Sequence, residues 1–179
     1  MLEQRTIGPE GIQNIPQILS GHEISRLPER FIVAYGEYVS DALKTHPYTM
    51  LQYTPEELIA SMQSGTSIVA LAPDMRLAGF AHLWRIDPNS YEKPRLEFGS
   101  WLSFNRHAAG EQILRAGTAL GRKIDPEAQI VAVVETGNLH AKEVIINTGG
   151  KEVGGTTSCN ITTPEGTPAQ MQIFDITHI

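Results

Sequence analysis

The middle of the chain limits the fold most, because strand and helix patterns alternate there. Pro94 to Phe104 has the alternation of a strand, and Ala108 to Lys123 repeats apolar residues at helical spacing. Ile130 to Val134 is a continuous apolar run, which is typical of a strand buried on both faces. Asn138 to Thr148 is helical again and ends at Gly149-Gly150. Packed layers of sheet and helix bury all four segments.

The flanking segments complete a mixed α/β order with an antiparallel front half. Met1 to Leu27 shows no clear period, so we expect a short strand or an irregular arm. Thr54-Pro55-Glu56-Glu57 is a capping box with proline at the first helical position, and it starts the second helix. We predict a single domain over residues 1–179. The remaining predicted elements are a helix after Pro28, a hairpin of Ser67–Ala72 with Arg76–Ile86, and strands near Lys151–Cys159 and Ala169–Thr177.

Composition and charge exclude several classes of protein. The net charge of −6 and the scattering of the 14 basic residues argue against a nucleic-acid partner. No apolar stretch approaches the roughly 20 residues that span a bilayer, and Met1 to Gly11 lacks a signal-peptide pattern. Cys159 is the only cysteine, which fits a reducing cytoplasm. No group of side chains has metal-ligand spacing, so we expect no metal.

Small residues open the predicted helix at Ala108. In Asn105-Arg106-His107-Ala108-Ala109-Gly110, alanine and glycine would let backbone N–H groups approach a phosphate at a helix N-terminus. The alternative register, shifted by one residue, would turn Glu111 towards the phosphate. Tight packing is a second explanation for the small residues.

Two units resemble the GNAT superfamily of acetyltransferases. One is the strand, loop and helix from Arg95 to Leu114, and the other runs from Val133 to Ala141, followed by Gly149-Gly150. The resemblance implies a central mixed sheet, splayed in its middle and flanked by about four helices. It also implies that acetyl-CoA or another acyl-CoA is the co-substrate, with its pyrophosphate at Asn105, Ala108, Ala109 and Gly110.

The resemblance also suggests what holds the rest of the co-substrate. Asn138 and Ala141 would contact the pantetheine arm, although Asn138 is equally suited to be an N-cap. A backbone N–H near Leu102, Ser103 or Phe104 would donate to the thioester oxygen.

Glu97 is the candidate general base, because it lies on the strand where many family members carry the base carboxylate. An exposed strand glutamate is the alternative. The family often has a tyrosine acid where this chain has Ile145, so Ser103, expected on the face of Glu97, is the candidate proton donor to the thiolate. Tyr48, Tyr53 and Trp84 are the candidate contacts for the acceptor.

These features predict an N-acetyltransferase that acts on the amine of a small molecule or a protein by direct attack. The alternative is a non-catalytic acyl-CoA-binding or interaction module with the same fold. Exposed edge strands make a homodimer plausible.

Overall fold

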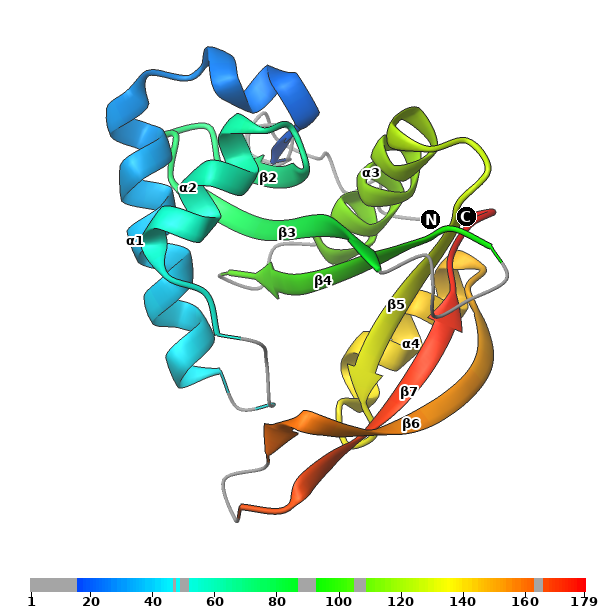
Figure 1. Ribbon diagram of the computed structural model, residues 1–179. Coiled ribbons are helices and arrows are strands. Elements are labelled where there is room, and N and C mark those ends of the chain that lie inside the picture. The colour runs from blue at the N-terminus through cyan, green and yellow to red at the C-terminus, as the bar shows by residue number, and fades with distance from the viewer. Residues whose placement is uncertain (1–15, 47, 49–51, 87–92, 105–108, 163–165) are drawn as a thin grey trace, which may run out of the picture.

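A computed structural model describes residues 16–46, 48, 52–86, 93–104, 109–162 and 166–179, without the side chains of 156–162 (Figure 1). Its elements are β1 (Gln17–Ser20), the 3-10 helix η2 (Gly21–Arg26), α1 (Glu29–Thr45), α2 (Pro55–Gln63), β2 (Ser67–Leu71), β3 (Leu77–Ile86), β4 (Arg95–Ser103), α3 (Ala109–Ile124), β5 (Gln129–Glu135), α4 (Leu139–Thr148), β6 (Lys151–Thr162) and β7 (Pro168–Asp175). None of the helices in these residues is long and apolar enough to cross a membrane.

The seven strands form one mixed sheet in the order β1-β2-β3-β4-β5-β7-β6. Strands β4 and β5 pair in parallel, and every other neighbouring pair is antiparallel. The mixed α/β class and the antiparallel front half are therefore confirmed. The N-terminal arm is not irregular throughout, because Ile18 pairs with Ala70 and adds β1 to the edge of the sheet.

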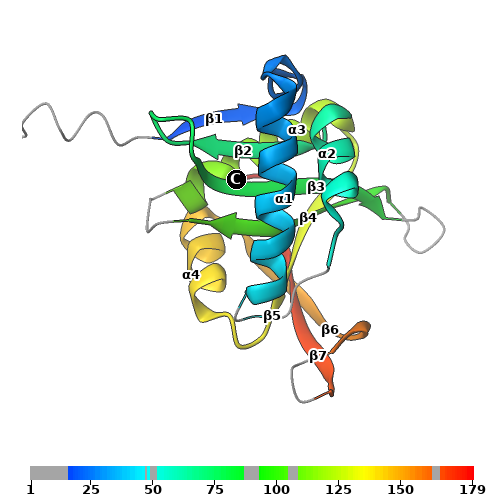
Figure 2. The ribbon, with the colours of Figure 1, turned by 90° about the vertical axis from the view of Figure 1, so that its left-hand side faces the viewer.

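Helices cover both faces of the sheet (Figure 1, Figure 2). Helices α1 and α2 pack on one face of the front strands, and α3 and α4 lie on the other. The apolar stripe of α3 includes Gly117 and Gly121, where the helix meets the sheet closely. A Cβ added at Gly117 would lie 2.4 Å from the Phe98 ring, and one at Gly121 would lie 2.6 Å from Ile130. Glycine at these positions lets α3 approach the strands.

A bulge at Ser100 divides β4 into two parts. His82 pairs with Gly99 and Phe80 pairs with Leu102, so Ser100 and Trp101 together stand opposite one residue of β3. The φ of Ser100 is 48°, in the left-handed region that non-glycine residues seldom occupy.

This bulge corrects the predicted alternation of β4. Leu96, Phe98 and Trp101 pack with the cluster under α3, whereas Leu102 and Phe104 pack with the cluster under α1 and α2. An unbroken strand would have placed Trp101 and Ser103 on the face of Glu97. The extra residue reverses the two faces from Trp101 onward, because side chains alternate strictly along a strand.

Strands β4 and β5 stay together over only part of their length. Their register runs from Arg95 with Gln129 to Phe98 with Ala132, and β5 then continues beside β7 alone, with Val133 opposite Ile173. The splay expected in the middle of the sheet is therefore present, and it begins just before the bulge.

Candidate functional site

A groove opens where β4 and β5 separate, on the side of the sheet that carries α3 and α4. It has a volume of about 680 Å³, and a smaller hollow continues between the two strands. The groove is lined by β4, by the start of α3, by one side of α4 and by the segment after α1. The residues that line it are His46, Tyr48, Trp101, Ser103, Gly110, Glu111, Asn138, His140, Ala141, Val144, Asn147 and Thr148.

The start of α3 forms one end of this groove. Gly110 is the second residue of the helix, and a Cβ added to it would lie 3.3 Å from the Trp101 ring. The indole Nε1 of Trp101 is buried and has no hydrogen-bond partner among the described residues. Asn105 and Ala108 of the predicted phosphate loop lie outside the described residues, whereas Ala109 is fully buried in the core.

Helix α4 brings Asn138 and Ala141 to the opposite wall. The Asn138 side chain caps α4, because its Oδ1 accepts a hydrogen bond from the Ala141 N–H at 3.1 Å. Both residues also line the groove, so the capping role predicted for Asn138 occurs at the site rather than away from it.

The peptide groups of β4 near the bulge differ in direction. The Phe104 N–H donates to the Ala78 carbonyl at 2.7 Å, and Leu102 is paired with Phe80. These two residues therefore belong to the ladder with β3, and Phe104 is not a suitable oxyanion donor. Because successive peptide groups of a strand point to opposite edges, the Ser103 N–H is directed to the splayed edge.

Ser103 itself lies on the groove, together with Trp101. The prediction that it shares the face of Glu97 is wrong, because the bulge lies between them. Its hydroxyl is on the side from which a ligand in the groove would approach. This position suits a proton donor to a thiolate better than the predicted one.

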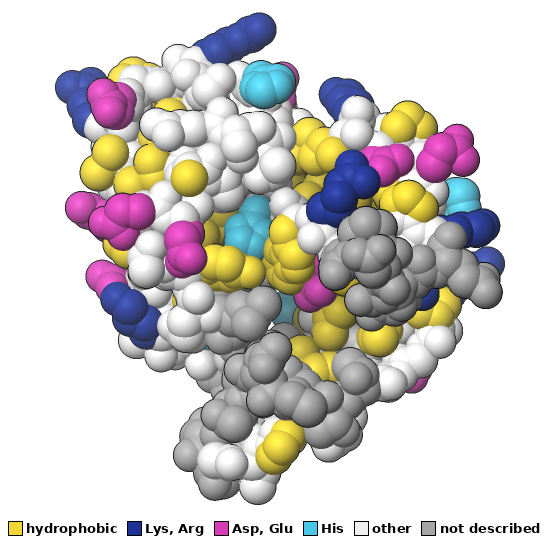
Figure 3. All heavy atoms as spheres, viewed as in Figure 1, with side chains coloured by type: hydrophobic (Ala, Val, Ile, Leu, Met, Phe, Trp, Pro, Cys, Tyr) yellow, Lys and Arg dark blue, Asp and Glu magenta, His cyan; other side chains and the backbone are white. Residues whose placement is uncertain are grey.

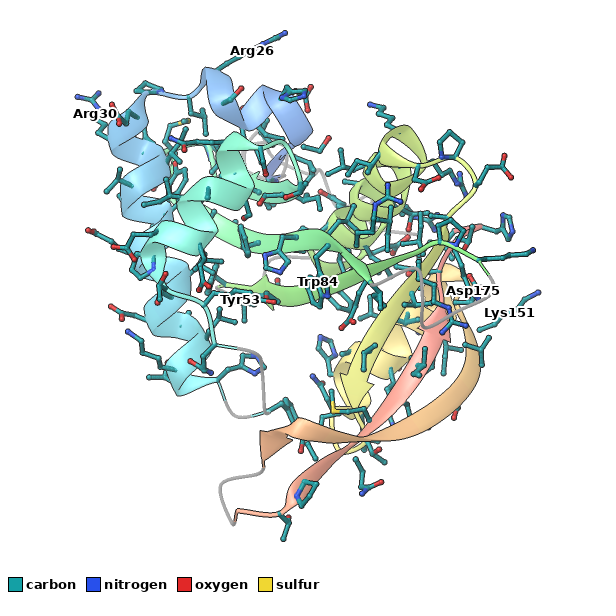
Figure 4. The ribbon with its side chains drawn as sticks, in the orientation of Figure 1. Arg26, Arg30, Tyr53, Trp84, Lys151 and Asp175 are labelled. Atoms are coloured by element: carbon teal, nitrogen blue, oxygen red, sulfur yellow. The ribbon has the colours of Figure 1, made fainter. Side chains whose placement is uncertain are left out.

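Glu97 lies on the other face of β4, in a cluster of aromatic rings. It pairs across the strands with Trp84, whose ring covers Gly99: a Cβ there would lie 2.4 Å from the indole. The ring of His82 is 4.8 Å from the centroids of both Tyr53 and Trp84, at interplanar angles of 81° and 84°. Figure 4 labels Tyr53, which lies just before α2, and Trp84 of β3, and the centroids of their rings are 6.4 Å apart. We call Tyr53, His82, Trp84 and Glu97 the acceptor cluster.

Tyr53 is held in the cluster by its backbone neighbours. The Ser40 hydroxyl of α1 donates to the Tyr53 carbonyl at 2.8 Å. The next residue, Thr54, forms the predicted capping box with Glu57, in which each side chain meets the backbone N–H of the other. The sequence therefore places Tyr53 by starting α2 directly after it.

Burial sets the charge state of the acceptor cluster. It raises the pKa of Glu97 to about 7 and lowers the pKa of His82 to about 4. Burial, with the charges of Glu97 and Glu57, raises the pKa of Tyr53 to about 12. Near neutral pH the imidazole and the phenol are therefore uncharged, while Glu97 is close to half ionised.

His82 was not among the predicted site residues. Its side chain is only 5% exposed, and both ring nitrogens lack hydrogen-bond partners among the described residues. The pattern Phe80-x-His82-x-Trp84 places a polar residue between aromatic residues on one strand face, which was the available signal.

Tyr48 and Ile145 also differ from expectation. Tyr48 lines the groove and is not part of the acceptor cluster. It lies near Gly137, two residues before the start of α4. Ile145 does point to the sheet, but it is fully buried, and a Cβ at Gly150 would lie 2.4 Å from its Cγ2. A tyrosine at this position, as the family often has, would therefore find no room. The α4 side that faces the groove is that of Ala141, Val144 and Thr148.

Comparisons with solved structures find the same architecture in acetyltransferases. A protein from Salmonella typhimurium that is described as an acetyltransferase and was solved with its cofactor acetyl-CoA has a TM-score of 0.64 and 15% identity, covering 89% of this chain and 91% of that one. A GNAT-family acetyltransferase from Streptococcus pneumoniae has a TM-score of 0.63 and 14% identity, covering 89% and 97%.

A mutant of the Vibrio cholerae spermidine N-acetyltransferase has a TM-score of 0.60 and 14% identity, covering 89% of this chain and 91% of its own. At these identities the likeness is one of fold. No protein-family model matches the sequence, and a comparison with curated proteins finds no match.

Proposed function

We propose that this chain, which has the fold of the GNAT superfamily, is an acyl-CoA-dependent N-acetyltransferase that transfers an acetyl group to an amine. The observation that carries the proposal is the position of the splay. Strand β4 leaves β5 just beyond Phe98, with a groove on one face and the half-buried Glu97 on the other. A donor and an acceptor can therefore meet at one strand from opposite sides.

The groove suits a long polar ligand such as acetyl-CoA, which supplies an activated acyl group. The helix N-terminus at Ala109 and Gly110 would bind its pyrophosphate through backbone N–H groups. Beyond Ala132, Val133 and Val134 pair only with β7 and leave an edge to which pantetheine amides can add as a strand would. Asn138 and Ala141 would contact the same arm, and the buried Trp101 Nε1 offers it a further donor.

Glu97 would prepare the acceptor for attack. Its carboxylate takes a proton from the ammonium group, and the neutral amine then attacks the thioester carbon. A carbon–nitrogen bond forms, and the carbon–sulfur bond breaks. The new amide nitrogen loses one proton and the thiolate gains one. Ser103 would relay this proton: its hydroxyl donates to the sulfur and takes back the proton that the nitrogen loses, while Glu97 releases the ammonium proton to water. A pKa near 7 suits a base that must accept and release a proton at neutral pH.

Binding and turnover test the proposal separately. Acetyl-CoA, CoA and longer acyl-CoAs should each be titrated while the melting temperature is followed, because a ligand that binds only the native state stabilises it. We expect acetyl-CoA to raise the melting temperature, and free CoA thiol to appear when a suitable amine is added. Absence of any shift would overturn the proposal.

A second outcome would favour the non-catalytic alternative. If acetyl-CoA binds tightly but no small amine and no peptide N-terminus releases thiol, the chain is an acyl-CoA-binding module. The Ser103→Ala variant adds a check on the mechanism. It should slow thiol release while leaving the acetyl-CoA melting shift unchanged.

A further inference from the structure

The geometry points to the acceptor cluster as a binding site for one class of amine: a primary ammonium group on an aromatic or apolar skeleton that carries no carboxylate. This inference deepens the proposed function and rests on it. It is carried by the rings of Tyr53, His82 and Trp84 and by the carboxyl group of Glu97 beside them.

The three rings pack against one another. His82 stands nearly perpendicular to both Tyr53 and Trp84, and the centroids of these two outer rings are 6.4 Å apart. Tyr53 and Trp84 are half-buried, so each keeps part of its surface exposed. In Figure 3 a histidine shows between hydrophobic side chains on this face of the molecule. The negative faces of aromatic rings such as Tyr53 and Trp84 attract a cation.

His82 supplies the observation that points to a ligand. His82 is only 5% exposed, yet neither nitrogen of its imidazole has a hydrogen-bond partner among the described residues. Buried polar groups are nearly always hydrogen-bonded, so a polar ligand or a water is needed there. The neutral ring offers one acceptor nitrogen and one N–H, and the acceptor can receive a hydrogen bond from an ammonium group that also meets Glu97.

The charges around the cluster select against a carboxylate on the ligand. The two charged groups that act on the Tyr53 phenol are both carboxylates, Glu97 and Glu57. Arg85, the next residue of β3 after Trp84, is paired with Asp125 at 2.8 Å. An amino acid would bring its own carboxylate close to Glu97, and like charges at a binding site oppose association. A monoamine with an apolar body avoids this repulsion and packs on the rings.

Direct binding can be measured without catalysis. The chain has two tryptophans, so Trp101→Phe leaves Trp84 as the only indole reporter. Phenethylamine and phenylalanine are the matched probes, because they differ only in the carboxylate. We expect a saturable change in Trp84 fluorescence with phenethylamine and an affinity at least about tenfold lower for phenylalanine. Equal or tighter binding of phenylalanine would overturn the inference.

Kinetics with acetyl-CoA then compare kcat/KM for phenethylamine, phenylalanine and spermidine. Phenethylamine should exceed both others by about tenfold or more. Trp84→Leu should raise its KM about tenfold. Phe31→Leu, which removes a ring that packs on Tyr35 instead, is the matched control and should leave KM unchanged.

His82 has its own pair of variants. His82→Leu keeps the volume and loses both nitrogens, so it should raise KM about tenfold. His82→Gln restores polar atoms and should recover part of that loss. Circular dichroism identifies any variant that fails to fold. In that case the parent's preference for phenethylamine over phenylalanine still tests the inference. A KM for His82→Leu no higher than that of His82→Gln would show that the nitrogens bind nothing.

The outcomes separate this inference from the proposed function. If acetyl-CoA raises the melting temperature and spermidine or amino acids are acetylated faster than phenethylamine, the function stands and the inference falls. If acetyl-CoA neither binds nor turns over, the function falls and the inference falls with it. If acetyl-CoA binds and phenethylamine is preferred, with the expected loss in Trp84→Leu, both stand.

Discussion

The two faces of β4 differ in burial and in the groups that they carry. On one face Glu97 lies among Tyr53, His82 and Trp84, where burial moves the pKa values of all the titratable groups. On the other face, Ser103 borders an open groove of about 680 Å³. Burial shifts pKa values on the first face, whereas the second face is an open groove.

The difference depends on a local break in the strand. Without the bulge at Ser100, side chains before and after it would follow one alternation, and Trp101 would face α2 instead of the groove. A bulge beside a splayed pair of strands thus provides two chemically different surfaces within a few residues. A substitution on one surface should therefore leave the properties of the other unchanged.

The largest effect should come from Glu97→Gln on the acceptor face. Loss of the proposed general base should lower kcat by about 100-fold or more, and it should remove the rise of kcat/KM that we expect of the parent through about pH 7. The affinity for acetyl-CoA should not change, because the groove lies on the other face. The exposed Glu37→Gln is the control. Unchanged turnover in Glu97→Gln would remove this carboxylate from the mechanism.

The next largest effect should be a loss of stability, and it should differ between two neighbouring positions of α4. Ile145→Tyr should destabilise the protein by about 1–3 kcal/mol or prevent folding, because the site is fully buried and closed by Gly150. Val144→Tyr should cost much less, because Val144 is half-buried and lines the groove. Urea unfolding of both variants measures the difference. Equal stability would show that the core face of α4 has room.

Gly110→Glu tests the groove alone. The new carboxylate at the start of α3 would meet the Trp101 ring and oppose a phosphate, so acetyl-CoA affinity should fall at least about tenfold. The acceptor cluster should still bind phenethylamine. Gly154→Glu, at a glycine of β6 with open space around it, is the matched control. Parent-like acetyl-CoA affinity in Gly110→Glu would place the phosphate site elsewhere.

The smallest effect concerns stability and pH. Glu97 keeps its proton in the folded state up to about pH 7, whereas the unfolded chain releases it near the ordinary value of 4.5, so stability falls as pH rises through this window. His82 acts in the opposite sense. Its folded pKa of about 4 lies below the ordinary 6.5, so its contribution is lost as pH falls through that interval.

Variants of each residue should therefore separate the two opposing dependences of folding stability on pH. Relative to the parent, Glu97→Gln should gain stability between about pH 5 and pH 8, on the order of 1 kcal/mol. His82→Leu should lose stability relative to the parent as the pH rises from about 4 to about 6.5. Urea midpoints at several pH values measure both changes. Parallel profiles for all three proteins would show that neither group is desolvated as the structure indicates.

Local signals in the sequence were enough for the element order. The capping box at Thr54 does start α2, and the apolar stripe with Gly117 and Gly121 does face the sheet. Both signals act within a few residues, through backbone hydrogen bonds or the helical repeat, so the chain carries them whatever surrounds it. The structure brings together Glu97, which the family resemblance predicted as a site residue, and Tyr53 and Trp84, which were predicted as contacts for the acceptor. Their roles stay predictions.

What the sequence determined by itself is the set of elements, their order and the residue types available for a site. The tertiary structure alone decided three further points: the bulge at Ser100, the absence of room at Ile145 and the burial of His82. Serine has no special preference for a positive φ, so pairing with β3 must impose the bulge. Burial and room depend on neighbours distant in sequence, such as Tyr53 beside His82, and no local pattern records how closely such neighbours pack.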